Sequence, residues 1–171
     1  MIPYTDTHCH LDFERFHEDR EQVIKRAKKA GLVWILNPGI DPETNRAAIE
    51  LSNRYSGFVS AAVGIHPNFG RPWSQVLFDQ LKQQAQSTGV VAIGEIGLDY
   101  YRQHTPVPQQ RQMFQNQLAL AAELSLPVII HNRDSTKDLM AILSEWLGEL
   151  KQSGHPLANR PGVMHSYSAD T

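Results

Sequence analysis

Histidine and glutamate side chains repeatedly follow short apolar runs along this chain, and both residue types are common metal ligands. An apolar run of this length is typical of a strand whose two faces are both buried in a parallel sheet. In a barrel of alternating strands and helices, the carboxyl ends of all strands meet at one face, where active sites are built. The spacing therefore predicts a metal site at that face, with His8, His10, Glu95, His131 and His165 as candidate ligands.

His8 and His10 form the most closely spaced pair of candidates. Segment 1–10 is predicted to be a strand, in which alternate side chains point to opposite faces. The two imidazoles would then share one side and chelate one ion, whereas Cys9 would face away as a small buried hydrophobic residue. Two polar residues at a strand end without metal are the alternative.

Glu95 favours the metal interpretation. It follows an apolar run that ends in Gly94, and an ionised carboxylate is costly to bury without a cation or hydrogen bonds. A salt bridge at the strand end is the alternative, but four histidines and one glutamate converging on one face point to metal. Nitrogen and oxygen ligands without thiolate predict magnesium, manganese or zinc rather than a structural zinc site.

A few residues beside these ligands are candidates for substrate binding. Arg133 could hold a phosphate through two parallel hydrogen bonds, with an ordinary loop ion pair as the alternative. His66, in a Gly-Ile-His-Pro segment, could contact substrate or form a hydrogen bond behind the ligands. Tyr100 and Tyr101 could stack on a base at the mouth of the site, although half-buried tyrosines are common in loops.

The elements that must position these residues alternate between strands and helices, which predicts βαβ units with right-handed crossovers. The expected strands are 1–10, 32–36, 58–65, 90–93, 126–130 and 162–164, and the expected helices are 18–30, 42–54, 74–86, 109–124 and 135–150. The predicted fold class is α/β, a TIM-type (β/α)8 barrel that is incomplete, with about six strands and five helices. A complete barrel needs roughly 250 residues. A smaller open α/β sheet is the alternative, and in both cases residues 1–171 form a single domain.

Composition and charge narrow the protein class. The chain is 41% hydrophobic and 20% charged, which is typical of a globular protein. A formal net charge of -2 gives no global attraction to nucleic acid, so any such binding must be local. A single cysteine excludes an intrachain disulfide and fits a reducing compartment. Because no leader-like or membrane-spanning segment is visible, the expected location is the cytoplasm, without membrane contact.

The ordered motifs of the chain resemble the successive signatures of the TatD family of metal-dependent deoxyribonucleases. The motifs that carry this resemblance are Asp6 to Asp12, Gly64 to Pro67, Gly94 to Tyr100, Val128 to Asp134 and Val163 to Ser168. The resemblance implies an amidohydrolase-like barrel that hydrolyses phosphodiester bonds in DNA, as a 3′–5′ exonuclease, with two divalent metal ions. It also implies ligand roles: His8 and His10 bind one metal, the catalytic Glu95 bridges two, and His131 and His165 bind the second.

The resemblance leaves other functions open. Members of the family continue past the motif at His165 to a further aspartate ligand, so a shortened member that is non-catalytic or weakly active is one alternative. A related hydrolase acting on D-aminoacyl-tRNA or on a carbon–nitrogen bond is another. An incomplete barrel is also expected to have open sheet edges, to expose inner-face residues such as Ile35 and Ile93, and to self-associate through those edges.

Overall fold

Six parallel strands form one sheet in the order of the sequence. The computed structural model describes residues 3–102 and 104–167. The strands are β1 (Tyr4–Asp6), β2 (Leu32–Pro38), β3 (Val59–Val63), β4 (Val90–Asp99), β5 (Val128–Arg133) and β6 (Gly162–Met164). Strands that pair in the sheet are also consecutive in the chain, which is the connectivity of a β/α barrel. The predicted incomplete barrel is confirmed.

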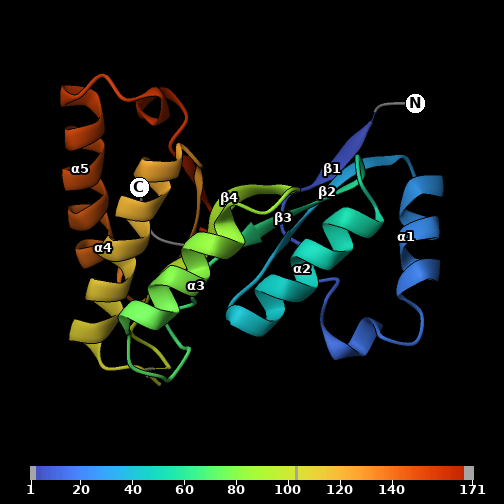
Figure 1. The fold of residues 1–171 in the computed structure, drawn as a ribbon, viewed down its shortest axis with the longest axis horizontal. Helices are drawn as coiled ribbons and strands as arrows, with labels where there is room; N and C mark the ends of the chain where they lie inside the picture. The colour runs from blue at the N-terminus through green and yellow to red at the C-terminus, as the bar shows by residue number, and fades with distance from the viewer. Residues whose placement is uncertain (1–2, 103, 168–171) are drawn as a thin grey trace.

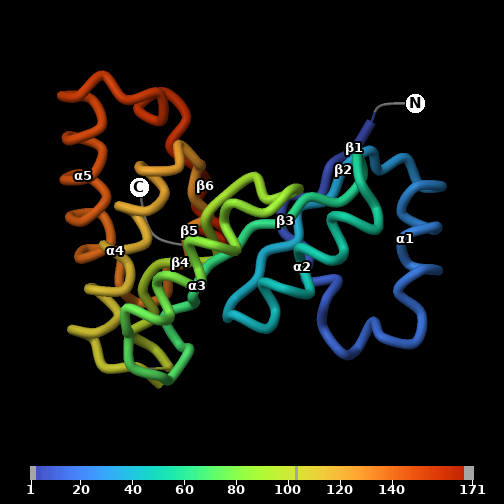
Figure 2. The backbone as a smooth tube through the Cα atoms, viewed as in Figure 1, coloured from blue at the N-terminus to red at the C-terminus, as the bar shows by residue number. Residues whose placement is uncertain are grey.

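One long helix follows each of the first five strands. These helices are α1 (Arg20–Lys29), α2 (Pro42–Arg54), α3 (Gln75–Ala85), α4 (Val107–Leu124) and α5 (Thr136–Gln152), and two short 3-10 turns are η1 (Glu14–Phe16) and η2 (Pro156–Asn159). Figure 1 shows the helices in sequence order across the molecule, from α1 on one side to α4 and α5 on the other. The tube in Figure 2 follows the strands in the same order. No helix in the described residues has the length and apolar composition needed to span a bilayer.

The start of α2 shows how local sequence sets an element boundary. The Asp41 side chain accepts hydrogen bonds from the backbone N–H groups of Glu43 and Thr44, at 2.9 and 2.8 Å. Thr44 Oγ1 accepts in return from the Asp41 N–H at 3.0 Å, and Pro42 occupies the first turn. This capping box satisfies donors that a helix start leaves free, so the predicted range 42–54 is confirmed.

Two strands differ most from their predicted ranges, and β2, β3 and β5 differ by two or three residues at an end. β1 ends at Asp6, so the two histidines of the first motif lie on the loop that follows it and not in a strand. β4 continues past Gly94 to Asp99 and pairs along its second half with β5. The first strand was predicted to begin at Met1, and Met1, Ile2 and the Ser168 of the last motif lie outside the described residues.

The apolar core lies mainly between the sheet and the helices. The largest buried cluster joins α3, α4 and α5 to the middle strands. The expectation that Ile35 and Ile93 are exposed is wrong, because both are buried. Ile35 belongs to a cluster with Leu51 of α2, and Ile93 belongs to the largest cluster. Strand alternation thus turns both toward the helices, while their neighbours Leu36 and Ala92 form a separate buried cluster.

Candidate metal centre

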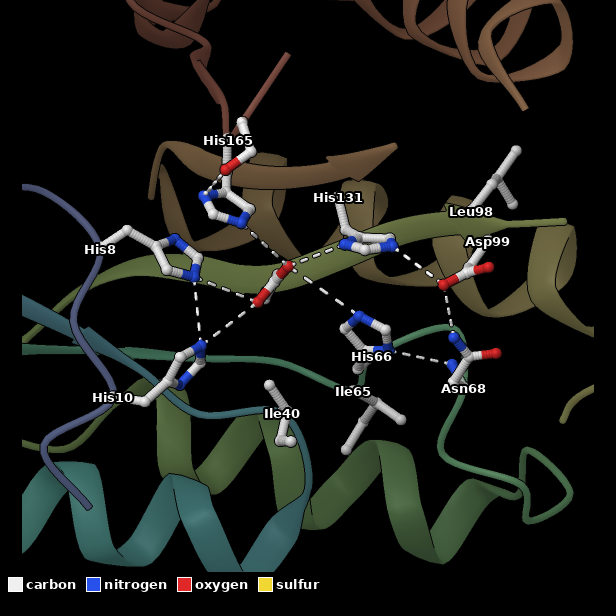
Figure 3. A network of polar contacts seen from close by, with 12 residues as sticks. His8, His10, Ile40, Ile65, His66, Asn68, Leu98, Asp99, His131 and His165 are labelled. Atoms are coloured by element: carbon white, nitrogen blue, oxygen red, sulfur yellow. Dashed lines mark hydrogen bonds and ion pairs between the residues drawn. The ribbon is translucent and has the colours of Figure 1, made fainter. Parts of the chain in front are cut away.

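Glu95 lies in the middle of the site on β4, and only 4% of the residue is exposed. Its Oε2 atom lies 3.3 Å from His8 Nε2 and 3.7 Å from His10 Nε2. Its Oε1 atom lies 2.9 Å from His131 Nδ1 and 3.9 Å from His165 Nε2. In Figure 3, His8 and His10 lie on one side of the network and His131 lies on the other. Each carboxylate oxygen therefore faces a different pair of predicted ligands.

The geometry of the first pair fits a metal ion. The Nε2 atoms of His8 and His10 face each other at 3.2 Å. Two nitrogens bound at about 2.0–2.1 Å to one tetrahedral zinc ion lie roughly 3.3 Å apart. The Nδ1 atoms of both rings are buried and have no hydrogen-bond partner among the described residues. With Glu95 Oε2, the two nitrogens form a compact set of three ligand atoms.

The loop that carries His8 and His10 is held from the neighbouring strand. Asn37 on β2 is completely buried, and its Oδ1 accepts the N–H of Leu11 at 2.6 Å. Its Nδ2 donates to Asp12 Oδ1 at 2.8 Å. Because Asn37 bonds the residues just after the two histidines, it limits the freedom of the loop at the point where ligand geometry matters.

His131 on β5 contacts a carboxylate on each side. Its Nδ1 faces Glu95, and its Nε2 lies 3.2 Å from Asp99 Oδ2. Burial lowers the pKa of His131, but hydrogen bonds and charge from Glu95 and Asp99 outweigh burial and raise that pKa above its ordinary value. A carboxylate behind an imidazole fixes which ring nitrogen carries the proton and orients the ring. Asp99 can therefore keep a proton on Nε2 of His131 while Nδ1, which faces Glu95, gives up its proton to a bound cation.

His165, just after β6, completes the predicted set. Its ring stacks on that of His8, with centroids 3.6 Å apart and planes 12° apart. Its Nδ1 lies 3.3 Å from Ser166 Oγ, which leaves Nε2 as the atom that faces Glu95. His8 follows β1 and His165 follows β6. The two rings can therefore meet only when all six strands of the described sheet are in place.

The ionisation of Glu95 is consistent with a cation site. Burial alone raises the pKa of this carboxyl, but hydrogen bonds from His131 and His8 hold the pKa far below its usual range. The carboxylate is therefore negative at neutral pH. Five imidazoles surround it, and an ionised group at this depth requires such partners or a cation.

His66 approaches the same carboxylate oxygen as His131. Its Nε2 lies 3.9 Å from Glu95 Oε1, and its Nδ1 accepts the backbone N–H of Asn68 at 3.1 Å. Burial, followed by the charge of His131, lowers the pKa of His66 to about 4. His66 is therefore an uncharged imidazole at neutral pH.

A cavity of about 430 Å³ opens beside the centre. Side chains of both charges line it, among them His10, His66, Glu95, Asp99, Arg102 and Arg133. The guanidinium carbon of Arg133 lies 4.0 Å from the centre of the exposed Tyr101 ring. Such stacking uses the flat face of the guanidinium and leaves its edge N–H donors available for an anion. Tyr100 instead packs against the core and donates a hydrogen bond to Asp138 at 2.8 Å.

All five predicted ligands thus meet at one face of the sheet. Grouping by distance also places His66 with Glu95 and His131, and His8 with Glu95 and His165. Asp99 and Asn68 were not predicted as site residues. The signal for Asp99 was present, because it ends the run Ile96–Leu98 as Glu95 ends the run before it.

Comparison with known proteins identifies the family of the chain. A family model described as TatD related DNase matches residues 5–171. The 3′-5′ ssDNA/RNA exonuclease TatD of Pectobacterium atrosepticum is 39% identical over 145 residues, which cover 85% of this chain and 56% of that protein. YabD of Bacillus subtilis, named as a metal-dependent hydrolase, is 42% identical over 140 residues. These residues cover 82% of this chain and 54% of YabD. The chain spans about half the length of the curated relatives it matches.

Solved structures agree with the sequence comparison. YjjV, a TatD homologue from Escherichia coli, has a TM-score of 0.80 and 34% identity, covering 98% of this chain and 61% of its own. The phosphotriesterase homology protein of the same organism has a TM-score of 0.60 at 16% identity, covering 84% of this chain and 58% of its own. At that identity the second likeness concerns the fold alone, which is an α/β barrel type in both cases.

Proposed function

Because this chain belongs to the TatD related DNase family, we propose that it carries the metal centre of a phosphodiester hydrolase that removes nucleotides from the 3′ end of single-stranded nucleic acid. The observation that carries the proposal is the placement of Glu95, whose two oxygens face separate histidine pairs. A carboxylate so placed is suited to bridge two divalent cations. The relative from Pectobacterium atrosepticum, named as an ssDNA/RNA exonuclease, supports the substrate class.

We assign the ligands by the oxygen that each pair faces. His8 and His10 would hold one cation with Glu95 Oε2, and His131 and His165 would hold a second with Oε1. Nitrogen and oxygen donors without thiolate suit magnesium, manganese or zinc. When bound, two such cations would activate a water molecule for attack and polarise the phosphoryl oxygens.

The residues around the cavity would bind and orient the substrate. Arg133 can offer its edge N–H donors to a phosphate while Tyr101 holds the plane of the guanidinium. Arg102 adds a second positive charge to the cavity. This local charge matters because the whole chain has a formal net charge of -2 and does not attract nucleic acid globally.

A direct assay tests this function. The chain is incubated with manganese or magnesium and a single-stranded oligonucleotide labelled at its 5′ end, beside the same oligonucleotide blocked at its 3′ end. We expect a ladder of products shortened from the 3′ end, protection by the block, and loss of activity with EDTA. Cleavage of a D-aminoacyl ester or a small amide in place of the oligonucleotide would contradict the proposal.

A further inference from the structure

Three imidazoles face the same oxygen of Glu95, and distance does not say which of them bind metal. His131 Nδ1, His165 Nε2 and His66 Nε2 lie 2.9, 3.9 and 3.9 Å from Oε1. A metal ligand must present a lone pair, whereas an N–H group presents a proton. The protonated nitrogen of each ring therefore decides its role, and the partner of its other nitrogen fixes which nitrogen that is.

In His66, a backbone hydrogen bond fixes which ring nitrogen carries the proton. The N–H of Asn68 donates to His66 Nδ1 at 3.1 Å, and a backbone N–H is always a donor. Nδ1 must therefore carry the lone pair, so the single proton of the neutral ring lies on Nε2. Nε2 is the atom that faces Glu95. His66 thus directs an N–H, and not a lone pair, into the site.

The local sequence His66-Pro67-Asn68 explains this arrangement. Proline has no N–H, so the first backbone donor after His66 is the N–H of Asn68, two residues later. The same arrangement recurs at His155-Pro156-Leu157, where the N–H of Leu157 donates to His155 Nδ1 at 3.2 Å. His155 lies beside η2, outside the metal centre. The proton position therefore comes from the His-Pro-Xaa segment itself and does not depend on a bound metal.

Asp99 links His66 and His131 and has opposite effects on them. Its Oδ2 accepts the Asn68 side-chain amide at 2.6 Å and lies 3.2 Å from His131 Nε2. By accepting the Nε2 proton of His131, Asp99 allows Nδ1 of that ring to lose its proton and bind a cation beside Glu95. By anchoring Asn68, it holds the N–H that leaves His66 with a proton toward the same oxygen. Asp99 is only 1% exposed, which keeps both arrangements rigid.

We propose that His66 does not bind metal and instead acts as a neutral hydrogen-bond donor, offering Nε2–H to a non-bridging phosphoryl oxygen of the substrate, with Asp99 and Asn68 as positioning residues. This inference rests on the proposed function for the identity of the substrate. A neutral imidazole aimed at a developing oxyanion stabilises charge without transferring its proton, so His66 forms and breaks no covalent bond. His8, His10, His131 and His165 remain as the metal-binding imidazoles.

The proton position is measurable in the unmodified protein. Long-range 1H–15N correlation of the ring nitrogens, in the metal-free 15N-labelled chain at pH 7.5, should show His66 with a protonated Nε2. His155 serves as the matched control and should show the same pattern. Addition of zinc should shift the ring nitrogens of His131 and His165 and leave His66 protonated at Nε2. A proton on Nδ1 of His66, or loss of its Nε2 proton on adding zinc, overturns the inference.

Variants separate donation from metal binding. Isothermal titration with zinc should give His66→Ala and His66→Gln the stoichiometry of the parent, whereas His131→Ala should lose binding. In the nuclease assay His66→Ala should lower kcat by about 10²–10³-fold with little change in KM, and His66→Gln, whose amide keeps a donor, should recover part of the loss. A lost zinc equivalent in His66→Ala contradicts the inference. If the parent has no nuclease activity, the proposed function fails, while the zinc titration and the proton positions still decide the role of His66.

Discussion

Glu95 shows at the scale of a single residue why we propose that the centre binds cations. Its carboxylate is buried among five imidazoles, and the two oxygens serve different histidine pairs. The sequence predicted that these residues share one face, since the carboxyl ends of parallel strands meet there. It did not predict which oxygen faces which pair, because that depends on side-chain rotation. It also did not predict the Asp99 contact with His131, which depends on β4 running five residues past Gly94.

Loss of the first histidine pair should remove one metal position. We expect the double variant His8→Ala with His10→Ala to bind one manganese ion fewer than the parent, because Glu95 Oε2 keeps no imidazole partner. The fold should persist, since both residues lie on a loop beyond the strand. Isothermal titration with manganese measures the stoichiometry, and far-UV circular dichroism checks the fold. Unchanged stoichiometry would remove His8 and His10 from the ligand set.

Neutralising the central carboxylate tests the bridge. Glu95→Gln keeps the volume of the side chain but removes the negative charge between the two proposed cation positions. We expect weaker binding of the metal pair and a fall in oligonucleotide hydrolysis on the order of 10²-fold or more, as for loss of an electrostatic group in a buried active site. Cleavage at the parental rate by the glutamine variant would show that Glu95 does not bridge.

At the scale of elements, local signals and long-range pairing were not equally visible in the sequence. The range of α2 was predicted to the residue because its start is defined locally: Asp41 caps it through short-range hydrogen bonds, and Pro42 occupies the first turn. β4 was predicted too short because a glycine is an ordinary sign of a strand end. Here Gly94 instead lies within the strand, whose continuation is stabilised by pairing with β5, a segment distant in sequence. Pairing of that kind is not encoded locally.

The backbone of β5 leaves no room for a side chain at Gly97, and a substitution can test this. It pairs with His131, its φ is 144°, and an added Cβ would lie 2.0 Å from the His131 carbonyl oxygen. Gly97→Ala should therefore destabilise the protein by about 1–3 kcal/mol and displace the strand that carries His131. Urea unfolding followed by tryptophan fluorescence measures the change.

Gly148 on α5 provides the matched control. A Cβ added there meets nothing within 4 Å. Gly148→Ala should stabilise the protein by about 0.5–1 kcal/mol, because alanine loses less backbone entropy than glycine in a helix. Equal effects of the two substitutions would mean that crowding at His131 does not explain Gly97.

At the scale of the whole molecule, the described sheet has two edges. β1 and β6 each pair with one neighbouring strand, and Val163 in β6 is 53% exposed. The buried state of Ile35 and Ile93 removes one predicted cause of association, since helices cover that face. The unpaired backbone groups of an edge strand remain a template for pairing with another chain.

We therefore expect the 171-residue chain to self-associate through its sheet edges. Light scattering after size-exclusion chromatography, at two protein concentrations, should show a mass that rises with concentration. Val163→Lys should reduce this association, because a charge on an edge strand opposes pairing. Val76→Lys on α3, at a position 77% exposed, should have no effect. A concentration-independent monomer would contradict the expectation.

The stacked rings of His8 and His165 also set the order in which the centre can assemble. A ribosome adds about 5–20 residues per second from the amino end, so His8 leaves it well before His165 is made. Until β6 has emerged, the nascent chain holds the His8–His10 pair but lacks the last imidazole of the second position. The second proposed metal position is thereby incomplete until His165 has been made, and a cation that held both positions would act only after β6 has joined the sheet.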